Sequence, residues 1–224
     1  LTGGLLTTLW IACLFGSVAA HELGHALAAL GYGIRTRAIT LLPIGGVAML
    51  ERDLRVPRHE FVVALAGPLV NVMIAALLAL TERLLAGVLA PSAGIFALTS
   101  WALTINLALA IFNLIPAFPM DGGRVLRAHL ATRMGRLRGT RIAARVGLVV
   151  AVLIGILGLF GNPMLVLIAL FVYLAAQAEL RRVEAEHAIG GGGGPGGWFL
   201  HGPGHTSPRF FRVEIHPPGY RSAR

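Results

Sequence analysis

The chain has 224 residues, of which 56% are hydrophobic and 13% charged, and this composition is typical of a membrane protein rather than of a soluble domain. All nineteen basic residues are arginine, and they form no patch interleaved with aromatic residues, so we expect no nucleic-acid partner. The single cysteine, Cys13, excludes an intramolecular disulfide and a thiolate metal cluster.

Long apolar runs predict the membrane-spanning helices. A hydrocarbon core about 30 Å thick is crossed by about 17 to 25 residues of helix. Five runs qualify, at residues 3–31, 61–81, 93–117, 145–161 and 163–179. We therefore expect an all-α membrane protein, a polytopic helical bundle with about five transmembrane helices. Every arginine except Arg83 falls on one side of the membrane, which the positive-inside rule assigns to the cytoplasm together with the C-terminus.

The segments between and after these runs are shorter or more polar. Residues 35–55 contain β-branched residues and are broken by Pro43, Gly45 and Gly46, which predicts a small β-hairpin at the membrane face. The Arg-rich stretch from Gly122 to Arg145 predicts an interfacial helix. We expect a membrane-embedded domain over residues 1–185 and a disordered, Gly/Pro-rich cytoplasmic tail over 186–224.

The first apolar run contains the sequence HELGH, with His21, Glu22 and His25. Ionisable residues inside a membrane span are costly, so their default interpretation is functional. Residues four apart lie on one helix face, so the two histidines can share a zinc ion while Glu22 takes a proton from its water. The alternative is a pair of histidines that only hydrogen-bond to neighbouring helices, with Glu22 in an interhelical salt bridge.

A catalytic zinc ion needs a third protein ligand and an open position for water. Asp121 follows a segment broken by Pro116 and Pro119, between an apolar run and a glycine pair, on the membrane side toward which His25 points. It is the best candidate among the few acidic residues. The alternative is that Asp121 caps a helix starting at Gly122, and both roles can hold together.

Three motifs in chain order, HELGH, AGPLVN and NLIPAFPMDGG, resemble those of the site-2 protease family of intramembrane zinc metalloproteases. The family motifs are H-E-x-x-H and N-x-x-P-x-x-P-x-D-G, and the resemblance covers residues 3–182. It implies one zinc ion per chain, held by His21, His25 and Asp121. It also implies that Glu22 is the catalytic acid/base and that zinc-bound water is the nucleophile.

The same resemblance implies how a substrate is held. Asn113 would contact the substrate backbone or the oxyanion, and the strand region with Gly45 and Gly46 would pair with an unwound substrate segment. The substrate would be a single-span or membrane-anchored protein within the lipid bilayer, cut in or next to its transmembrane segment. The resemblance also implies a bacterial or archaeal cell membrane. Members of the family commonly have one more helix before H-E-x-x-H, so we expect that an N-terminal helix is missing here. Two rival hypotheses are a divalent-metal transporter and a catalytically silent scaffold with the same fold.

Overall fold

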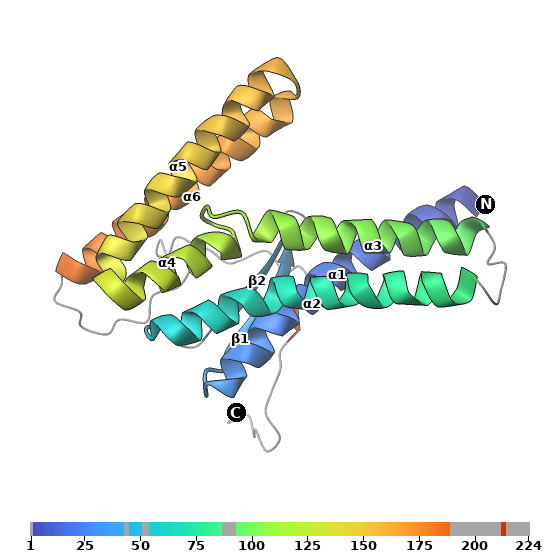
Figure 1. The fold of residues 1–224 in the computed structure, drawn as a ribbon, viewed down its shortest axis with the longest axis horizontal. Coiled ribbons are helices and arrows are strands. Elements are labelled where there is room, and N and C mark those ends of the chain that lie inside the picture. Colours follow the sequence, from blue (N-terminus) through green and yellow to red (C-terminus); the bar gives the residue numbers. More distant parts are fainter. Residues whose placement is uncertain (1, 43–44, 51–53, 87–92, 189–211, 214–224) are drawn as a thin grey trace.

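The computed structural model describes residues 2–42, 45–50, 54–86, 93–188 and 212–213. Six helices and three strands lie within these ranges (Figure 1). The helices are α1 (Thr2–Gly31), α2 (Pro57–Ala86), α3 (Ala93–Asn113), α4 (Asp121–Met134), α5 (Arg136–Phe160) and α6 (Pro163–Ala188). The strands are β1 (Thr36–Leu42), β2 (Gly45–Leu50) and β3 (Arg212–Val213).

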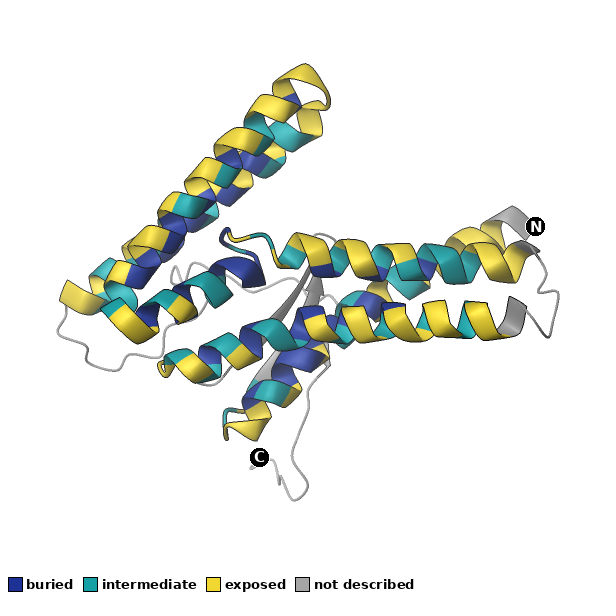
Figure 2. Ribbon diagram, in the orientation of Figure 1, coloured by how far each residue is buried: buried dark blue, intermediate teal, exposed yellow. Residues whose placement is uncertain are grey.

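Five of the described helices are long and apolar enough to cross a membrane, which confirms the predicted number of spans. They cover Gly4–Gly31, Pro57–Leu84, Gly94–Asn113, Arg136–Phe160 and Pro163–Ala188. Much of their outer surface is exposed, as the yellow faces of the long helices in Figure 2 show. Many of the exposed residues are large and apolar, for example Leu77 and Ile111. Such faces are stable against lipid and costly against water, so the chain is an integral membrane protein.

Helices α1, α2 and α3 pack against one another, and α5 and α6 form a second, hairpin-like pair joined to the first group by α4 (Figure 1). The α5–α6 contact is rich in small residues such as Ala151, Ala169 and Ala176, which let helix backbones approach closely in a membrane. Phe118 and Met120, just before α4, are buried against this pair. The segment that leads into α4 is therefore held against the α5–α6 pair.

The segment between α3 and α4 is irregular. The apolar run predicted a helix to residue 117, but α3 ends at Asn113 because Pro116 and Pro119 cannot donate the backbone hydrogen bonds of a continuing helix. A side chain at Gly122 would overlap the carbonyl groups of Leu114 and Ile115. The chain thus folds back tightly here, and α4 begins close to the end of α3.

The predicted interfacial helix from Gly122 to Arg145 is wrong in its extent. Helix α4 ends at Met134, and the residues from Arg136 onwards form the first turns of α5. Gly135 separates the two helices with a φ of 81°, a left-handed conformation that glycine adopts without the steric cost of a side chain. One predicted helix is therefore a short helix followed by the start of a membrane span.

Strands β1 and β2 run antiparallel, with Ile39 opposite Ala48, and both contact α1. Strand β3 pairs with the other edge of β1, so the strand order is β2-β1-β3. Residues 43–44, between β1 and β2, and most of the predicted tail lie outside the described residues. The hairpin at the membrane face and the disordered tail therefore stay predictions.

Candidate metal centre

Helix α1 places both histidines of HELGH on the same buried face. His21 and His25 are one helical turn apart, and their rings meet edge to face with centroids 4.7 Å apart. Their Nε2 atoms are separated by 3.1 Å. Glu22, between them in sequence, is also buried. The first motif therefore forms a compact polar group inside an apolar helix bundle.

Asp121, the first residue of α4, reaches the same point from a distant part of the chain. Its Oδ2 atom lies 3.1 Å from His21 Nε2 and 3.0 Å from His25 Nε2. Zinc bonds of about 2.05 Å in a tetrahedral site separate neighbouring donor atoms by about 3.3 Å. Among the described residues, these three side chains form the group whose spacing suits a metal ion.

The partners of the histidine Nδ1 atoms fix which ring nitrogen carries the proton. His21 Nδ1 is 2.5 Å from the side-chain oxygen of Asn71, and His25 Nδ1 is 2.7 Å from the carbonyl oxygen of Val63. Both oxygens can only accept, so each Nδ1 donates and each Nε2 keeps its lone pair. Two Nε2 lone pairs and a carboxylate oxygen of Asp121 thus converge, and a cation between them satisfies all three.

The amide of Asn71 is itself held in one orientation. Its Nδ2 donates to the side-chain oxygen of Asn106 over 2.8 Å. The Nδ2 of Asn106 donates in turn to Ser17 Oγ and to the carbonyl of Ala102, over 2.9 and 2.8 Å. With its nitrogen committed, Asn71 can turn only its oxygen toward His21. A chain of buried hydrogen bonds across α1, α2 and α3 therefore supports the metal group.

Gly67 on α2 provides the space in which the donor atoms meet. A methyl group there would overlap His25 Nε2 and would lie 2.7 Å from His21 Nε2. Real side chains do not approach that closely, so a larger residue would displace one of the imidazoles. The absence of a side chain at this position leaves the Nε2 atoms room for a ligand.

The charge of Asp121 suits a metal ligand. Burial alone would raise the pKa of the Asp121 carboxyl, and the guanidinium of Arg124 opposes this because it favours the charged form. Arg124 Nη1 lies 3.6 Å from Oδ1, the oxygen that does not contact the histidines. The helix begins at Asp121 itself, after Met120, so the carboxylate is directed at the metal group rather than acting as the N-cap.

The other predicted site residues are not among the three donors of this group. Asn113 ends α3, is partly exposed, and donates from Nδ2 to the carbonyl of Leu109 over 2.9 Å. Gly45 and Gly46 are in β2, opposite Leu42 and Leu41 of β1. Their contact with substrate stays a prediction. Gly67 and Asn71 belong to the AGPLVN motif, but the sequence did not indicate that they act at the metal group, and it did not single out Val63 or Arg124 at all. These four residues orient the three donors or make room for them.

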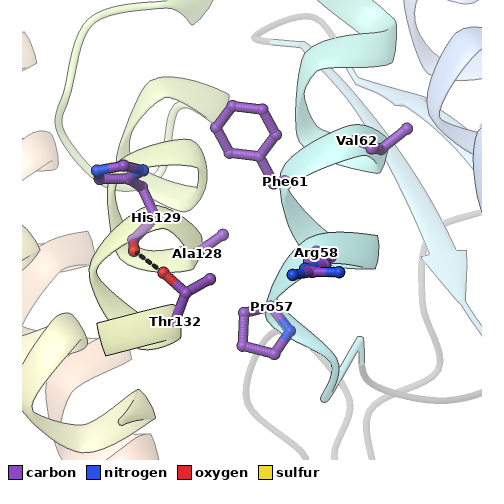
Figure 3. A pocket seen from close by; sticks show the side chains of 7 residues that line it. All are labelled: Pro57, Arg58, Phe61, Val62, Ala128, His129 and Thr132. Carbon is purple, nitrogen blue, oxygen red and sulfur yellow. Dashed lines mark hydrogen bonds between the residues drawn. The ribbon is translucent and has the colours of Figure 1, made fainter. Parts of the chain in front are cut away.

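A separate cavity of about 330 Å³ lies between the first turns of α2 and the second half of α4 (Figure 3). Its walls come from the stretch Pro57 to Val62 and from Ala128 to Thr132, and they are mainly apolar. None of its lining residues is a member of the metal group.

The model of "Peptidase family M50" matches residues 9–89 and 87–154. A zinc metalloprotease of Methanocaldococcus jannaschii is 43% identical over 175 residues, covering 77% of this chain and 50% of the relative. Stage IV sporulation protein FB of Bacillus subtilis is 32% identical over 168 residues, covering 74% of this chain and 56% of that protein.

The curated relatives are thus longer, and the chain spans about half the length of the first of them. A solved structure of a site-2 protease from Methanocaldococcus jannaschii superposes with a TM-score of 0.59 at 40% identity, covering 77% of each chain. The matched region contains all three residues of the metal group. The chain therefore belongs to peptidase family M50, the site-2 protease family of zinc metalloproteases.

Proposed function

We propose that the protein is an intramembrane zinc endopeptidase that hydrolyses peptide bonds within or next to transmembrane segments of membrane-anchored proteins. The observation that carries this proposal is the convergence of His21 Nε2, His25 Nε2 and Asp121 Oδ2 in a buried site of a membrane-spanning bundle. Membership of the M50 family supports the same reaction. Three protein ligands are the number that a catalytic zinc site uses when one position is left for water.

In this proposal His21, His25 and Asp121 hold one zinc ion. When bound, zinc supplies Lewis-acid chemistry, because it polarises the scissile carbonyl and lowers the pKa of a coordinated water to about 7. Glu22 adjoins His21 in the sequence and is buried. Its carboxylate takes a proton from the attacking water and delivers it to the leaving nitrogen, so that one residue acts first as base and then as acid.

Substrate binding is assigned to two further elements. Strand β2, with Gly45 and Gly46, adds an unwound substrate segment by backbone hydrogen bonds, a mode that demands little sequence selectivity. Asn113 stands eight residues before Asp121 and holds the substrate backbone or the oxyanion. To do so, the side-chain amide of Asn113 gives up its hydrogen bond to the Leu109 carbonyl and donates to the substrate instead. Unwinding is required because a helical peptide keeps its carbonyl groups in intrahelical hydrogen bonds.

The orientation in the membrane follows from charge. Arg124, Arg133 and the other arginines near α4 favour the cytoplasmic side for the end of the bundle where α4 lies. The active site then opens toward the cytoplasm, and the tail over residues 186–224 is a disordered cytoplasmic segment. The lipid bilayer is the environment of both enzyme and substrate.

The substrate is found by comparing membrane proteomes of cells that express the wild type or Glu22→Gln. We expect a membrane-anchored protein to accumulate uncut with the variant, while its shortened form appears with the wild type. Glu82→Gln is a matched control, since Glu82 also lies in a span but accepts hydrogen bonds from Thr99 and Ser100 away from the metal group. The proposal is contradicted if wild type and Glu22→Gln give the same cleavage products.

A further inference from the structure

Arg127 of α4 is a buried cation that the proposed reaction does not use. It is 1% exposed, and its guanidinium contacts Glu60 of α2 and Glu179 of α6, which are 3% and 5% exposed. Arg127 Nε donates to Glu60 Oε1 over 3.0 Å, Nη2 donates to the same oxygen, and Nη1 donates to Glu179 Oε1. One guanidinium therefore ties three helices together through charge-assisted hydrogen bonds.

The arginine remains charged in this setting. Burial alone would lower the pKa of Arg127, but the Glu60 and Glu179 carboxylates raise it above its ordinary value. The ring of Phe118 adds a cation–π contact, with its centroid 5.2 Å from the Cζ atom of Arg127. Phe118 belongs to the folded-back segment just before Asp121. The guanidinium thus contacts α2 and α6, and also the turn from which α4 starts.

The Glu60 contact joins the two helices that set the metal group. Asp121 begins α4, and Arg127 follows six residues later, about 9 Å along the helix axis. Glu60 lies one turn before Val63, whose carbonyl accepts the hydrogen bond of His25. Asp121 and His25 are therefore connected in two ways: directly at the metal group, and through α4, the Arg127–Glu60 ion pair and α2.

We propose that the Arg127–Glu60 ion pair is a positioning device that sets the distance between Asp121 and His25, and so the affinity of the site for zinc. The inference rests on the metal centre of the proposed function. The Arg127–Glu179 pair has a different role, because α6 carries none of the three proposed ligands. It anchors the α5–α6 pair to α4.

The two glutamates provide a matched comparison. Both carry one negative charge, both are buried to a similar degree, and both bind the same guanidinium. If the cluster only stabilised the fold, removing either charge would have similar effects on zinc binding. If the pair positions Asp121, loss of Glu60 weakens zinc binding and loss of Glu179 does not.

The experiment measures the zinc dissociation constant of the full chain in lipid nanodiscs, by competition with a chromophoric chelator, for wild type, Glu60→Gln, Glu179→Gln and Arg127→Lys. We expect Glu60→Gln and Arg127→Lys to raise the zinc dissociation constant, by less than the about 10- to 100-fold seen when a direct partner of a metal ligand is removed. We expect Glu179→Gln to keep the wild-type zinc affinity while lowering the melting temperature of the metal-free protein.

Equal zinc dissociation constants for Glu60→Gln and Glu179→Gln would overturn the proposal. If Glu60→Gln does not fold, Glu60→Asp keeps the charge and shortens the arm, and wild-type zinc affinity in that variant would overturn it equally. Because no substrate is present, the outcome is independent of peptide hydrolysis. A wild type that binds zinc tightly but cuts no substrate would contradict the proposed function and leave this comparison intact.

Discussion

The side-chain oxygen of Asn71 lies 2.5 Å from Nδ1 of His21, so a residue of α2 fixes the tautomer of a histidine on α1. Because an amide oxygen only accepts, the proton resides on Nδ1 and the Nε2 lone pair faces Asp121. The same logic applies to His25 and the carbonyl of Val63. Helix α2 therefore orients both histidines without supplying a ligand of its own.

Replacing Asn71 by leucine removes this acceptor and leaves His21 free to turn. We expect Asn71→Leu to raise the zinc dissociation constant about 10- to 100-fold, as loss of an outer-shell partner does. Asn71→Asp retains an acceptor for Nδ1 and should bind zinc more tightly than Asn71→Leu. Chelator competition on the purified proteins measures both. Wild-type affinity in Asn71→Leu would show that Asn71 does not orient the ligand.

A side chain at Gly67 competes with the imidazoles for space. We expect Gly67→Ala to lose most of its zinc, measured as zinc per chain by elemental mass spectrometry, because the new methyl group overlaps the Nε2 atom of His25. Gly16→Ala is the matched control, since a methyl group on Gly16 of α1 meets no atom within 4 Å. A full zinc load in Gly67→Ala would show that the metal does not bind between these imidazoles.

The carboxylate of Asp121 supplies both a donor atom and a negative charge. Asp121→Asn removes the negative charge while nearly preserving the shape of the side chain. We expect Asp121→Asn to lower the zinc content strongly and Arg124→Gln to lower it less, because Arg124 faces only the second oxygen. An unchanged zinc content in Asp121→Asn would remove this residue from the ligand set.

The proposed orientation can be tested with one engineered cysteine. Cys13 is the only native cysteine, so Cys13→Ser provides a background for His129→Cys, an exposed position on α4. We expect a membrane-impermeant maleimide to label it in inverted vesicles and not in intact cells. Labelling in intact cells would reverse the assigned topology.

Much of the fold was predictable because long apolar runs leave few alternatives in a membrane. The limits of the runs were less accurate. The second span was expected to start at residue 61, but α2 begins at Pro57. The first turn contains the charged residue Glu60, which does not count toward an apolar run. In the folded protein Arg127 forms an ion pair with Glu60, so the carboxylate can be buried there. Asp121 was expected beside the histidines from the proline break before it, and the structure places it there.

The contacts that orient the site could not be predicted in the same way. A backbone carbonyl such as that of Val63 has no signature in the sequence, and its meeting with His25 depends on the rotation of two packed helices. Arg127 was counted among the arginines of an interfacial helix, but it is 1% exposed. Its burial depends on Glu60 and Glu179, which lie 67 and 52 residues away in sequence.

The most direct test of the central claim is cleavage of a purified single-span substrate by the purified protein in proteoliposomes, with the product termini read by mass spectrometry. We expect the wild type to cut within or next to the apolar segment, to lose activity when zinc is chelated and to regain it when zinc is restored. Glu22→Gln should bind about one zinc ion per chain and cut nothing. Cleavage by Glu22→Gln at the wild-type rate, or by the wild type without zinc, would contradict the proposed mechanism.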